Sequence, residues 1–395
     1  MCDALMGSGK TTAAIKMMNE NPDQRYFFVT QFLTEVKRIK ENCRIREFAE
    51  PMQLGDGKLG NIRSLVDKGY NITSTHALFY RYDANILESI RKWKYTLVLD
   101  EVVDVIEFLE VTPNDIQKML ATDTIAVDEK TRRVTWQHAD YVGAWSKLKT
   151  QIENSCVTYE NDRLMVWMLP IELFTAFDNV IILSYMFKAQ LQYYYFLVNN
   201  VDLVNIGIAK KDGQYRLVFE ADAVPRVPIP LIHILDDDNL NAIGDRKTNL
   251  SSTWFMNQMK VAEKPSIKQL KNNIYNVFSN RWGAKSKEIL WSTYIKAQNA
   301  LRGNGYSKSF LSFNARATND YRDRKYLAYA VNIYVSPDIS VYFSTRGYQI
   351  DNDAYALSTM LQWLWRSAIR DGKEVWLYIP SSRMRTLLED WLNNQ

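Results

Sequence analysis

The sequence predicts an α/β chain with two parallel-sheet domains, and three observations support this fold class. A glycine-rich loop occupies residues 4–12, an apolar segment that ends in two carboxylates spans residues 95–102, and strand-like and helix-like segments alternate along the chain. Such alternation is typical of parallel sheets, because two parallel neighbours need a crossover that is usually a helix. A chain of 395 residues is also too long for one ordinary core, so two domains are expected.

The glycine-rich segment has the pattern of a phosphate-binding loop that opens a helix. Gly7 and Gly9 allow backbone N–H groups to point into one concavity that holds phosphate oxygens. Lys10 supplies a cation for the β- and γ-phosphates, and the hydroxyl of Thr11 is the expected Mg²⁺ ligand. Ala4 stands where the usual pattern has its first glycine, and its small side chain preserves the tight turn. The residues expected to contact a nucleoside triphosphate are Met6, Gly7, Ser8, Gly9, Lys10, Thr11 and Thr12.

The loop lies so near the first residue that the strand before it is expected to be missing. Only residues 1–3 precede Ala4, whereas a buried central strand needs about five residues. The first domain is therefore predicted to lack its N-terminal strand. Either a neighbouring segment of the chain fills this place in the sheet, or translation began at an internal methionine.

The apolar segment at residues 95–102 predicts a buried parallel strand with acidic residues at its carboxyl end. Ligands of open α/β sheets bind at that edge. Asp100 is therefore the expected second contact to Mg²⁺, and Glu101 is placed to polarise the water that attacks the γ-phosphate. ATP and Mg²⁺ are the expected cofactors.

The other segments of the first half complete a parallel sheet of RecA type, which gives a first domain over residues 1–186. An apolar strand is expected at 180–185, and residues 123–136 predict a β-hairpin insertion. The remaining expected strands lie at 26–30 and 71–76, and the expected helices lie at 10–20, 33–41, 60–68 and 84–93.

The second half repeats this alternation and predicts a second RecA-like domain over residues 187–395. Its long helix is expected over residues 354–370, because Gly372 is a stop signal directly after it. The other expected elements are helices at 187–198 and 383–393 and strands near 203–208, 288–293 and 374–380.

Composition limits the class of protein further. The net charge of +4 neither requires nor excludes nucleic acid, because a basic groove can exist on a nearly neutral chain. The three cysteines are scattered and form no CxxC pair, so neither a zinc site nor a disulfide framework is expected, and a reducing cytoplasm fits. No apolar run reaches 18 residues, so no membrane span is expected.

The order of these segments resembles the superfamily 2 helicases, the DEAD-like group, and the nearest likeness is to helicases encoded by tailed phages. The phosphate loop and the pair Asp100-Glu101 match family motifs I and II. Gln31 lies where the family has motif Ia, and Ser74-Thr75-His76 resembles a Thr-Thr-His element that touches the nucleic-acid backbone. The resemblance implies that Gln31, Thr75 and His76 contact nucleic acid. Ser184 is the only clear correspondence to the Ser-Ala-Thr motif, which in that family links hydrolysis to domain movement.

The segment 362–370 resembles family motif VI, with Trp365 in place of a glycine and the second arginine one residue late. Gln362, Arg366 and Arg370 recur at a spacing of four, which predicts one stripe of a helix. Such a stripe could direct a guanidinium group at the γ-phosphate, the arginine-finger role, with Arg366 preferred over Arg370. Arg316, Thr318 and Asn319 lie where motif V belongs and are further candidates for nucleic-acid contact.

The resemblance implies an ATP-dependent helicase or translocase that hydrolyses ATP between two RecA-like domains. Its implied partners are single- or double-stranded nucleic acid, with DNA favoured, and replication proteins, and no membrane. The implied location is the cytoplasm, that of the host if the chain is phage-encoded.

Three alternatives stay open. A DNA-packaging ATPase of the terminase type shares the loop and the acidic pair, but should carry clustered nuclease carboxylates in its second half. A nucleotide kinase also fits the loop, but is usually a single domain. The non-enzymatic alternative is a remnant that binds nucleic acid and hydrolyses ATP poorly.

Overall fold

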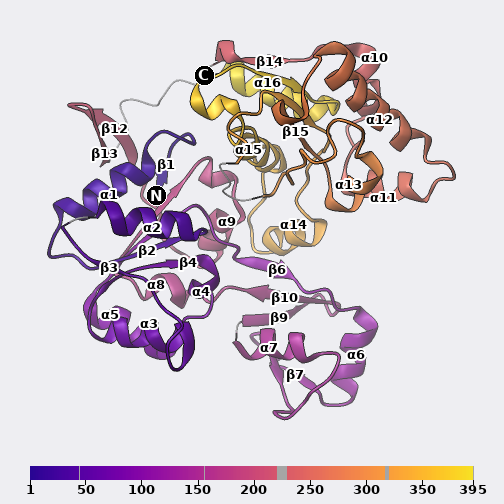
Figure 1. Ribbon diagram of the computed structural model, residues 1–395. Coiled ribbons are helices and arrows are strands. Elements are labelled where there is room, and N and C mark those ends of the chain that lie inside the picture. The colour runs from indigo at the N-terminus through magenta and orange to yellow at the C-terminus, as the bar shows by residue number, and fades with distance from the viewer. Residues whose placement is uncertain (44, 155, 220–228, 316–319, 395) are drawn as a thin grey trace. The chain divides into compact units, whose positions relative to one another are not determined.

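The computed structural model describes residues 1–43, 45–154, 156–219, 229–315 and 320–394 (Figure 1). Its contacts divide the chain into two compact units, and the division falls after Ala223 rather than after residue 186. The first unit comprises Met1–Ala4, Gly9–Ala223 and Pro337–Gln349, and the second comprises Leu5–Ser8, Val224–Ser336 and Ile350–Gln395. None of the helices within the described residues has the length and apolar character that a membrane-spanning helix requires.

The first unit is built on a six-stranded sheet in which all neighbouring strands are parallel, as the alternating pattern predicts. In sheet order the strands are β1 (Cys2–Asp3), β11 (Asn179–Ser184), β5 (Thr96–Asp100), β2 (Tyr26–Thr30), β4 (Asn71–Thr75) and β3 (Phe48–Ala49). Figure 1 shows two helices on each face of this sheet: α1 (Lys10–Glu20) and α2 (Leu33–Asn42) on one, α3 (Gly57–Asp67) and α5 (Ala84–Trp93) on the other.

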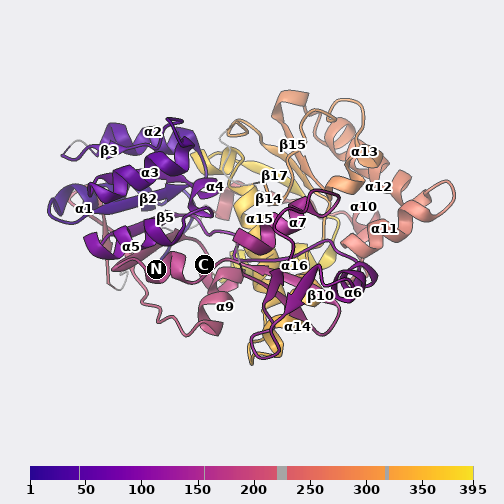
Figure 2. The same ribbon diagram turned by 90° about the horizontal axis from the view of Figure 1, so that it is seen from below.

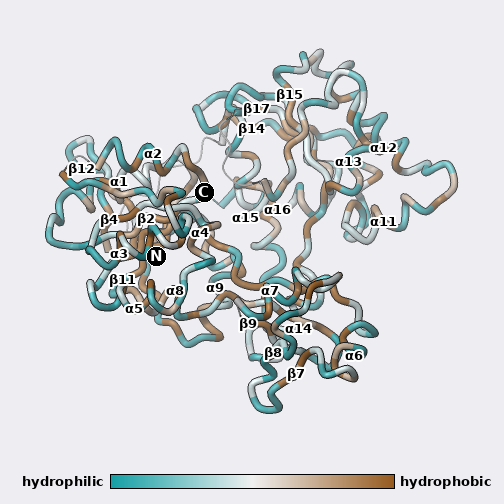
Figure 3. Tube along the Cα trace, turned by 60° about the horizontal axis from the view of Figure 1, so that its bottom comes forward, coloured by the Kyte–Doolittle hydropathy of each residue, from teal (hydrophilic) through white to brown (hydrophobic). Residues whose placement is uncertain are grey.

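The strands of this sheet are apolar because both of their faces are covered. Tyr26 and Phe28 point to the core beneath α1 and α2. Phe27, between them, contacts the rings of Tyr95 and Phe177 at centroid distances of 4.9 and 5.5 Å. β2 is buried along its whole length, and β11 is buried over its last three residues, 182–184 (Figure 3). A strand buried on both faces directs its last residues to the sheet edge, where ligands bind.

The sheet has an N-terminal strand, so the prediction that the first domain lacks one is wrong. β1 is only two residues long, and Cys2 and Asp3 pair in parallel with Leu183 and Ser184 of β11. On its other side Cys2 forms a parallel bridge with Ile206, whose amide donates to the carbonyl of Met1 at 2.7 Å. A strand of two residues suffices here because neighbours on both sides satisfy its backbone groups.

The first unit carries an insertion with a core of its own between β5 and β11. An antiparallel sheet, in the order β6-β10-β9, packs with two helices and the hairpin that the sequence predicts at 123–136 (Figure 2). Its elements are β6 (Ile106–Phe108), α6 (Pro113–Ala121), β7 (Ile125–Val127), β8 (Val134–Trp136), α7 (Ser146–Asn154), β9 (Cys156–Glu160) and β10 (Leu164–Met168). Helix α14 (Pro337–Ser344) returns to this insertion, since Tyr342 donates to the sulfur of Met168 at 2.8 Å and the guanidinium of Arg346 pairs with Glu160 at 3.0 Å.

Short elements complete the first unit. They are α4 (His76–Phe79), α8 (Glu172–Thr175), α9 (Leu191–Val198) and the antiparallel hairpin of β12 (Gly207–Lys211) and β13 (Gln214–Val218). This hairpin packs along α1, where Tyr215 and Leu217 join the core that contains Ala14 and Met18.

The second unit contains a four-stranded parallel sheet with helices around it. In sheet order the strands are β14 (Ile232–Ile234), β17 (Val375–Tyr378), β16 (Tyr326–Tyr329) and β15 (Ile289–Ser292). The helices are α10 (Asp238–Asn241), α11 (Ser252–Lys260), α12 (Pro265–Asn276), α13 (Ile295–Leu301), α15 (Asn352–Leu364) and α16 (Ser382–Asn393).

The long helix of this unit ends earlier than expected. α15 stops at Leu364, and a 3₁₀ turn over Ala368–Asp371 follows, so the expected single helix over 354–370 is wrong. The hydroxyl of Ser367 donates to the carbonyl of Leu364 at 2.6 Å, and the amide of Ala368 leaves the helix ladder to donate to the carbonyl of Arg324. A serine that bonds locally to the backbone competes with helix continuation.

Candidate functional site

Backbone geometry shapes the predicted phosphate loop. Gly7 and Gly9 have left-handed φ angles of +79° and +91°, which residues with a Cβ rarely adopt. α1 begins at Lys10, and the amide of Ala13 donates to the carbonyl of Gly9 at 2.8 Å, which closes the first turn. The N–H groups of the first turn and the positive dipole end of this helix therefore lie at the loop, as an anion site requires.

The loop holds a buried cation and a buried hydroxyl. The side chain of Lys10 is nearly enclosed, with 8% exposure, and its Nζ donates to the carbonyl of Ala4 at 2.5 Å. The Oγ of Ser8 is also buried and has no hydrogen-bond partner among the described residues. Donors enclosed in this way fit phosphate oxygens, because those acceptors would satisfy both groups.

The acidic strand meets the loop at its carboxyl end. The hydroxyl of Thr11 donates to Oδ1 of Asp100 at 3.2 Å, so the two predicted Mg²⁺ contacts lie side by side. Glu101, the next residue, has a φ of +70°, and its amide donates to the carbonyl of Leu183 in β11. A glutamate in this region stores backbone strain, a condition that concentrates at functional sites.

Several charged groups lie close together in this site, where Lys10 is buried and Asp100 and Glu101 are partly buried. Burial, together with the neighbouring charges of Glu101 and Glu35, raises the pKa of Asp100 to about 7, although Lys10 and the hydrogen bond from Thr11 oppose this shift. Burial lowers the pKa of Lys10, and the carboxylates of Glu101 and Asp100 oppose that shift. A divalent cation beside Asp100 would stabilise its ionised form, and a hydroxyl with a carboxylate suits Mg²⁺, which favours hard oxygen ligands. The residues therefore fit a magnesium–nucleotide.

Tyr215 lies at this site although no sequence motif marks it. The ring of Tyr215 lies so close to the loop that a Cβ on Gly9 would be 2.8 Å from it. Arg216, its neighbour in β13, pairs with Glu20 of α1 at 3.4 Å. Gly9 is thus required both for its φ angle and for this approach. An Asp-Gly turn between two alternating segments, 207–211 and 214–218, was the sequence signal for this hairpin.

The predicted nucleic-acid contacts of the first unit lie along the same sheet edge. Gln31 directly follows β2, and Thr75 ends the neighbouring strand β4, opposite Thr30. Gln31 and Thr75 are half-buried, whereas His76 is buried at the start of α4. The fold therefore brings the three residues together, with Thr75 more accessible than His76. Arg316 and Thr318, like Asn319, lie outside the described residues.

The predicted arginine-finger residues lie in the second unit but not on one helical stripe. Gln362 is in the last turn of α15, where its amide donates to the hydroxyl of Ser358 at 3.4 Å. Arg366 follows the helix end, and Arg370 belongs to the 3₁₀ turn. Both arginines are partly exposed. Arg366 and Arg370 are therefore two separate candidates for the arginine finger.

The strand order, the left-handed glycines and the Thr11–Asp100 contact define the class of protein: a P-loop α/β protein with two RecA-like parallel sheets. Residues 228–392 match the family model described as the YonV C-terminal Rossmann-like domain. The whole chain is 37% identical, over 412 residues, to the "SPbeta prophage-derived uncharacterized protein YonV" of Bacillus subtilis (strain 168), and the alignment covers 100% of this chain and 98% of that protein. The chain belongs to the YonV family.

Solved structures with a similar course of the chain include two XPD proteins. An apo XPD structure has a TM-score of 0.49 and 12% identity over 98% of this chain and 94% of its own. The structure of S. tokodaii Xpd4 also has a TM-score of 0.49 and 12% identity, over 99% of this chain and 93% of its own. The structure of the DUF1998 helicase MrfA bound to DNA and AMPPNP has a TM-score of 0.36 and 9% identity, over 100% of this chain and 48% of its own. The fold assignment rests on the strand order and loop geometry above, and a nearest likeness to phage helicases stays a prediction.

Substitution of Asp100 should change how stability depends on pH. The pKa of Asp100 in the folded chain lies above its unfolded value of 3.8, so the folded state binds an extra proton between that pH and about 7. Stability is therefore highest below this range and falls as the pH rises through it. Asp100→Asn removes the titrating group and therefore this loss of stability. The free energy of unfolding of the variant minus that of wild type should be larger at pH 8 than at pH 5, by on the order of 2–3 kcal/mol.

Urea-induced unfolding of the protein, free of nucleotide and metal, measures this difference. Asp140→Asn is the matched control, because Asp140 is an exposed carboxylate of the same unit. If the free energy of unfolding changed with pH equally in wild type and in Asp100→Asn, Asp100 would not be held in a desolvated site.

Proposed function

We propose that the chain is an ATP-dependent nucleic-acid helicase or translocase. The observation that carries the proposal is the contact between the phosphate loop and the acidic strand, where Thr11 meets Asp100 beside the strained Glu101. Such a contact assembles the parts of a nucleotide-hydrolysing site in one place. Thr11 and Asp100 would hold a Mg²⁺ ion, which would supply positive charge against the negative charge that develops during hydrolysis.

Each side chain of the site has a role in this proposal. Lys10 exchanges its bond to the carbonyl of Ala4 for oxygens of the β- and γ-phosphates, a stronger, charge-assisted bond. Asp100 and Thr11 hold the metal. Glu101 positions and polarises the attacking water, because it directly follows β5 at the carboxyl edge of the sheet.

Coupling to nucleic acid is supported by the second parallel sheet and by the first sheet's edge. Gln31, Thr75 and His76 would contact the strand in the first unit, and Arg316 and Thr318 in the second. Arg366, with Arg370 as the alternative, would stabilise charge on the γ-phosphate when the two units close. A single-domain nucleotide kinase would leave the second sheet without a role, and the helicase assignment therefore accounts for more of the chain. DNA is the favoured substrate, and the prophage-derived relative is compatible with a role beside replication proteins.

Hydrolysis of ATP should depend on Lys10 and respond to nucleic acid. Lys10→Ala should lower the steady-state rate by at least about 10²-fold, because the β- and γ-phosphates lose their buried cation. Glu101→Gln should bind nucleotide but not turn it over. The wild-type rate should rise when single-stranded DNA or RNA is added, and parallel assays with DNA, RNA and neither measure this.

Lys37→Ala is the control, because Lys37 lies on α2 with 78% of its side chain exposed. Full turnover by Lys10→Ala would contradict the nucleotide site. A wild-type rate that no nucleic acid changes would contradict the motor function while leaving the ATPase in place.

Single substitutions should show which of the two arginines is the arginine finger. If Arg366 is the finger, Arg366→Ala lowers kcat by about 10³-fold with little change in the KM for ATP, because the guanidinium acts on the transition state. Arg366→Lys should not restore the rate, since an ammonium lacks the planar fork. Arg370→Ala is the matched comparison. A larger loss of kcat in Arg370→Ala would transfer the role to that residue, and an unchanged kcat in both would exclude a finger from this segment.

A further inference from the structure

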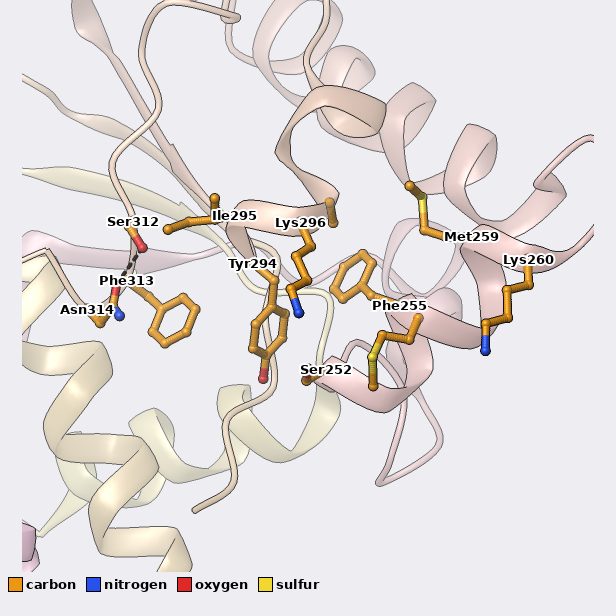
Figure 4. Close-up of a pocket in the computed structure, with 12 residues that line it drawn as sticks. Ser252, Phe255, Met259, Lys260, Tyr294, Ile295, Lys296, Ser312, Phe313 and Asn314 are labelled. Carbon is orange, nitrogen blue, oxygen red and sulfur yellow. Dashed lines mark hydrogen bonds between the residues drawn. The ribbon is translucent and has the colours of Figure 1, made fainter. Parts of the chain in front are cut away.

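The second unit contains an open apolar cavity of about 500 Å³ that the nucleotide site does not use. Figure 4 shows its lining, which combines three aromatic rings, two methionines and two lysines. The aromatic residues are Phe255, Tyr294 and Phe313, and the lysines are Lys260 and Lys296. A volume of this size lies within the range of small-ligand pockets, roughly 300–1,000 Å³.

The cavity lies at the carboxyl edge of the second sheet. Tyr294 and Ile295 follow β15 and open α13. Beside them, Phe310 forms a parallel bridge with Trp291 of β15, and the amide of Leu311 donates to the carbonyl of Trp291 at 3.0 Å. The segment that contains Phe313 therefore leaves the sheet at the same edge as Tyr294. Ligands of open parallel sheets bind at this edge.

The aromatic side chains form a fixed wall. The ring centroids of Tyr294 and Phe313 are 5.2 Å apart at an interplanar angle of 75°, and those of Phe255 and Tyr294 are 5.8 Å apart. The hydroxyl of Tyr294 donates to the carbonyl of Asn332 at 2.8 Å, which holds its ring in place. The wall thus presents aromatic surface that is positioned before any ligand arrives. Aromatic side chains placed in this way stack on unpaired bases.

The polar groups around the wall favour an anionic ligand. Figure 4 shows Lys296 extending beside Tyr294, with Lys260 at one rim. No carboxylate lines the cavity, and neither lysine forms an ion pair with a carboxylate of the described residues. At the other rim, Ser312 donates to Oδ1 of Asn314 at 2.5 Å, which leaves the amide N–H groups of Asn314 directed elsewhere as donors.

The exposed apolar side chains at the cavity mouth also require an explanation. Ile295 is 65% exposed beside the partly buried Tyr294, and Met256 is 45% exposed beside the buried Phe255. An apolar surface flanked by cations matches a nucleobase with its phosphate, because the base is flat and apolar on its faces and the phosphate is negative. A purely apolar small molecule or peptide would make no use of the lysines.

We propose that this cavity receives an unstacked base of single-stranded nucleic acid, with Phe313 against the base and Lys296 beside the backbone phosphate. The inference rests on the proposed function, since it names where the second unit holds the strand. It adds a recognition mode, base stacking, to the backbone contacts expected in the first unit. The strand would then be held in part independently of its phosphates.

The experiment compares two fluorescent 15-nucleotide strands at one salt concentration: oligothymidine, and the same strand with abasic sites at its central positions. Phe313→Leu should bind oligothymidine about 5- to 150-fold more weakly than wild type does, because one stacked base is lost. It should bind the abasic strand nearly as wild type does.

Two further variants keep the test decisive. Lys296→Gln, at an exposed position, should weaken binding of both strands alike and reduce the salt dependence by about one unit of slope. Tyr275→Leu is the matched control, because Tyr275 is a 42% exposed aromatic residue on α12 outside the cavity. All three variants should retain the ATPase rate measured without nucleic acid, which also verifies that they fold.

The outcomes separate the inference from the function that it deepens. If Phe313→Leu loses no affinity, or loses it equally for both strands, the cavity holds no base and belongs to an apolar small molecule or a peptide. Wild-type protein that still binds strands and hydrolyses ATP would then leave the motor function intact. Wild-type protein that binds neither strand would overturn both proposals.

Discussion

The first unit depends on one contact between segments 89 residues apart, the hydrogen bond from Thr11 to Asp100. It joins the phosphate loop to the acidic strand inside a partly buried site. Without a ligand, this arrangement is costly, because carboxylates and an ammonium group are desolvated together. Its retention in the fold is understandable if a magnesium–nucleotide supplies the missing charge. Sites of this kind lower the stability of the free protein, because their groups are arranged to bind a ligand.

The surrounding structure holds the loop in place by contacts from distant parts of the chain. β1 contributes only Cys2 and Asp3, yet β11 on one side and the segment at Ile206 on the other complete its hydrogen bonds. Asp3 also accepts the amides of Met186 and Phe187 at 2.7 and 2.9 Å, which joins the loop's strand to the segment after β11. The loop is thus linked to the strand that ends in Ser184, the position expected to couple hydrolysis to movement.

Local patterns in the sequence were sufficient to predict the glycine-rich loop and its contact with the acidic strand. The spacing of Gly7, Gly9 and Lys10 determines a loop by itself, and an apolar run before Asp100 determines where a buried strand ends. Parallel neighbours then meet at one edge, so the contact between loop and acidic strand follows from topology. The parallel sheets, the hairpin at residues 125–136 and most helix positions were predictable for the same reason.

Features that depend on distant contacts could not be predicted in this way. β1 was missed because two residues carry no periodic pattern, and only its neighbours make it a strand. The end of α15 at Leu364 was missed because it depends on the bond of Ser367 and on the amide of Ala368, which pairs with a distant carbonyl. Tyr215 and the aromatic cavity were missed for a related reason, since aromatic residues fill cores as often as they line sites.

The central claim is that the junction of Thr11 and Asp100 holds a metal-bound nucleotide. Calorimetric titration of ADP, with Mg²⁺ and with a chelator, tests it on wild type and on Asp100→Asn. The account predicts that Mg²⁺ strengthens ADP binding to the wild-type protein by at least about tenfold, equal to about 1.4 kcal/mol, and that Asp100→Asn loses most of this gain. Absence of ADP binding, or equal affinity with and without Mg²⁺ in the wild type, would contradict it.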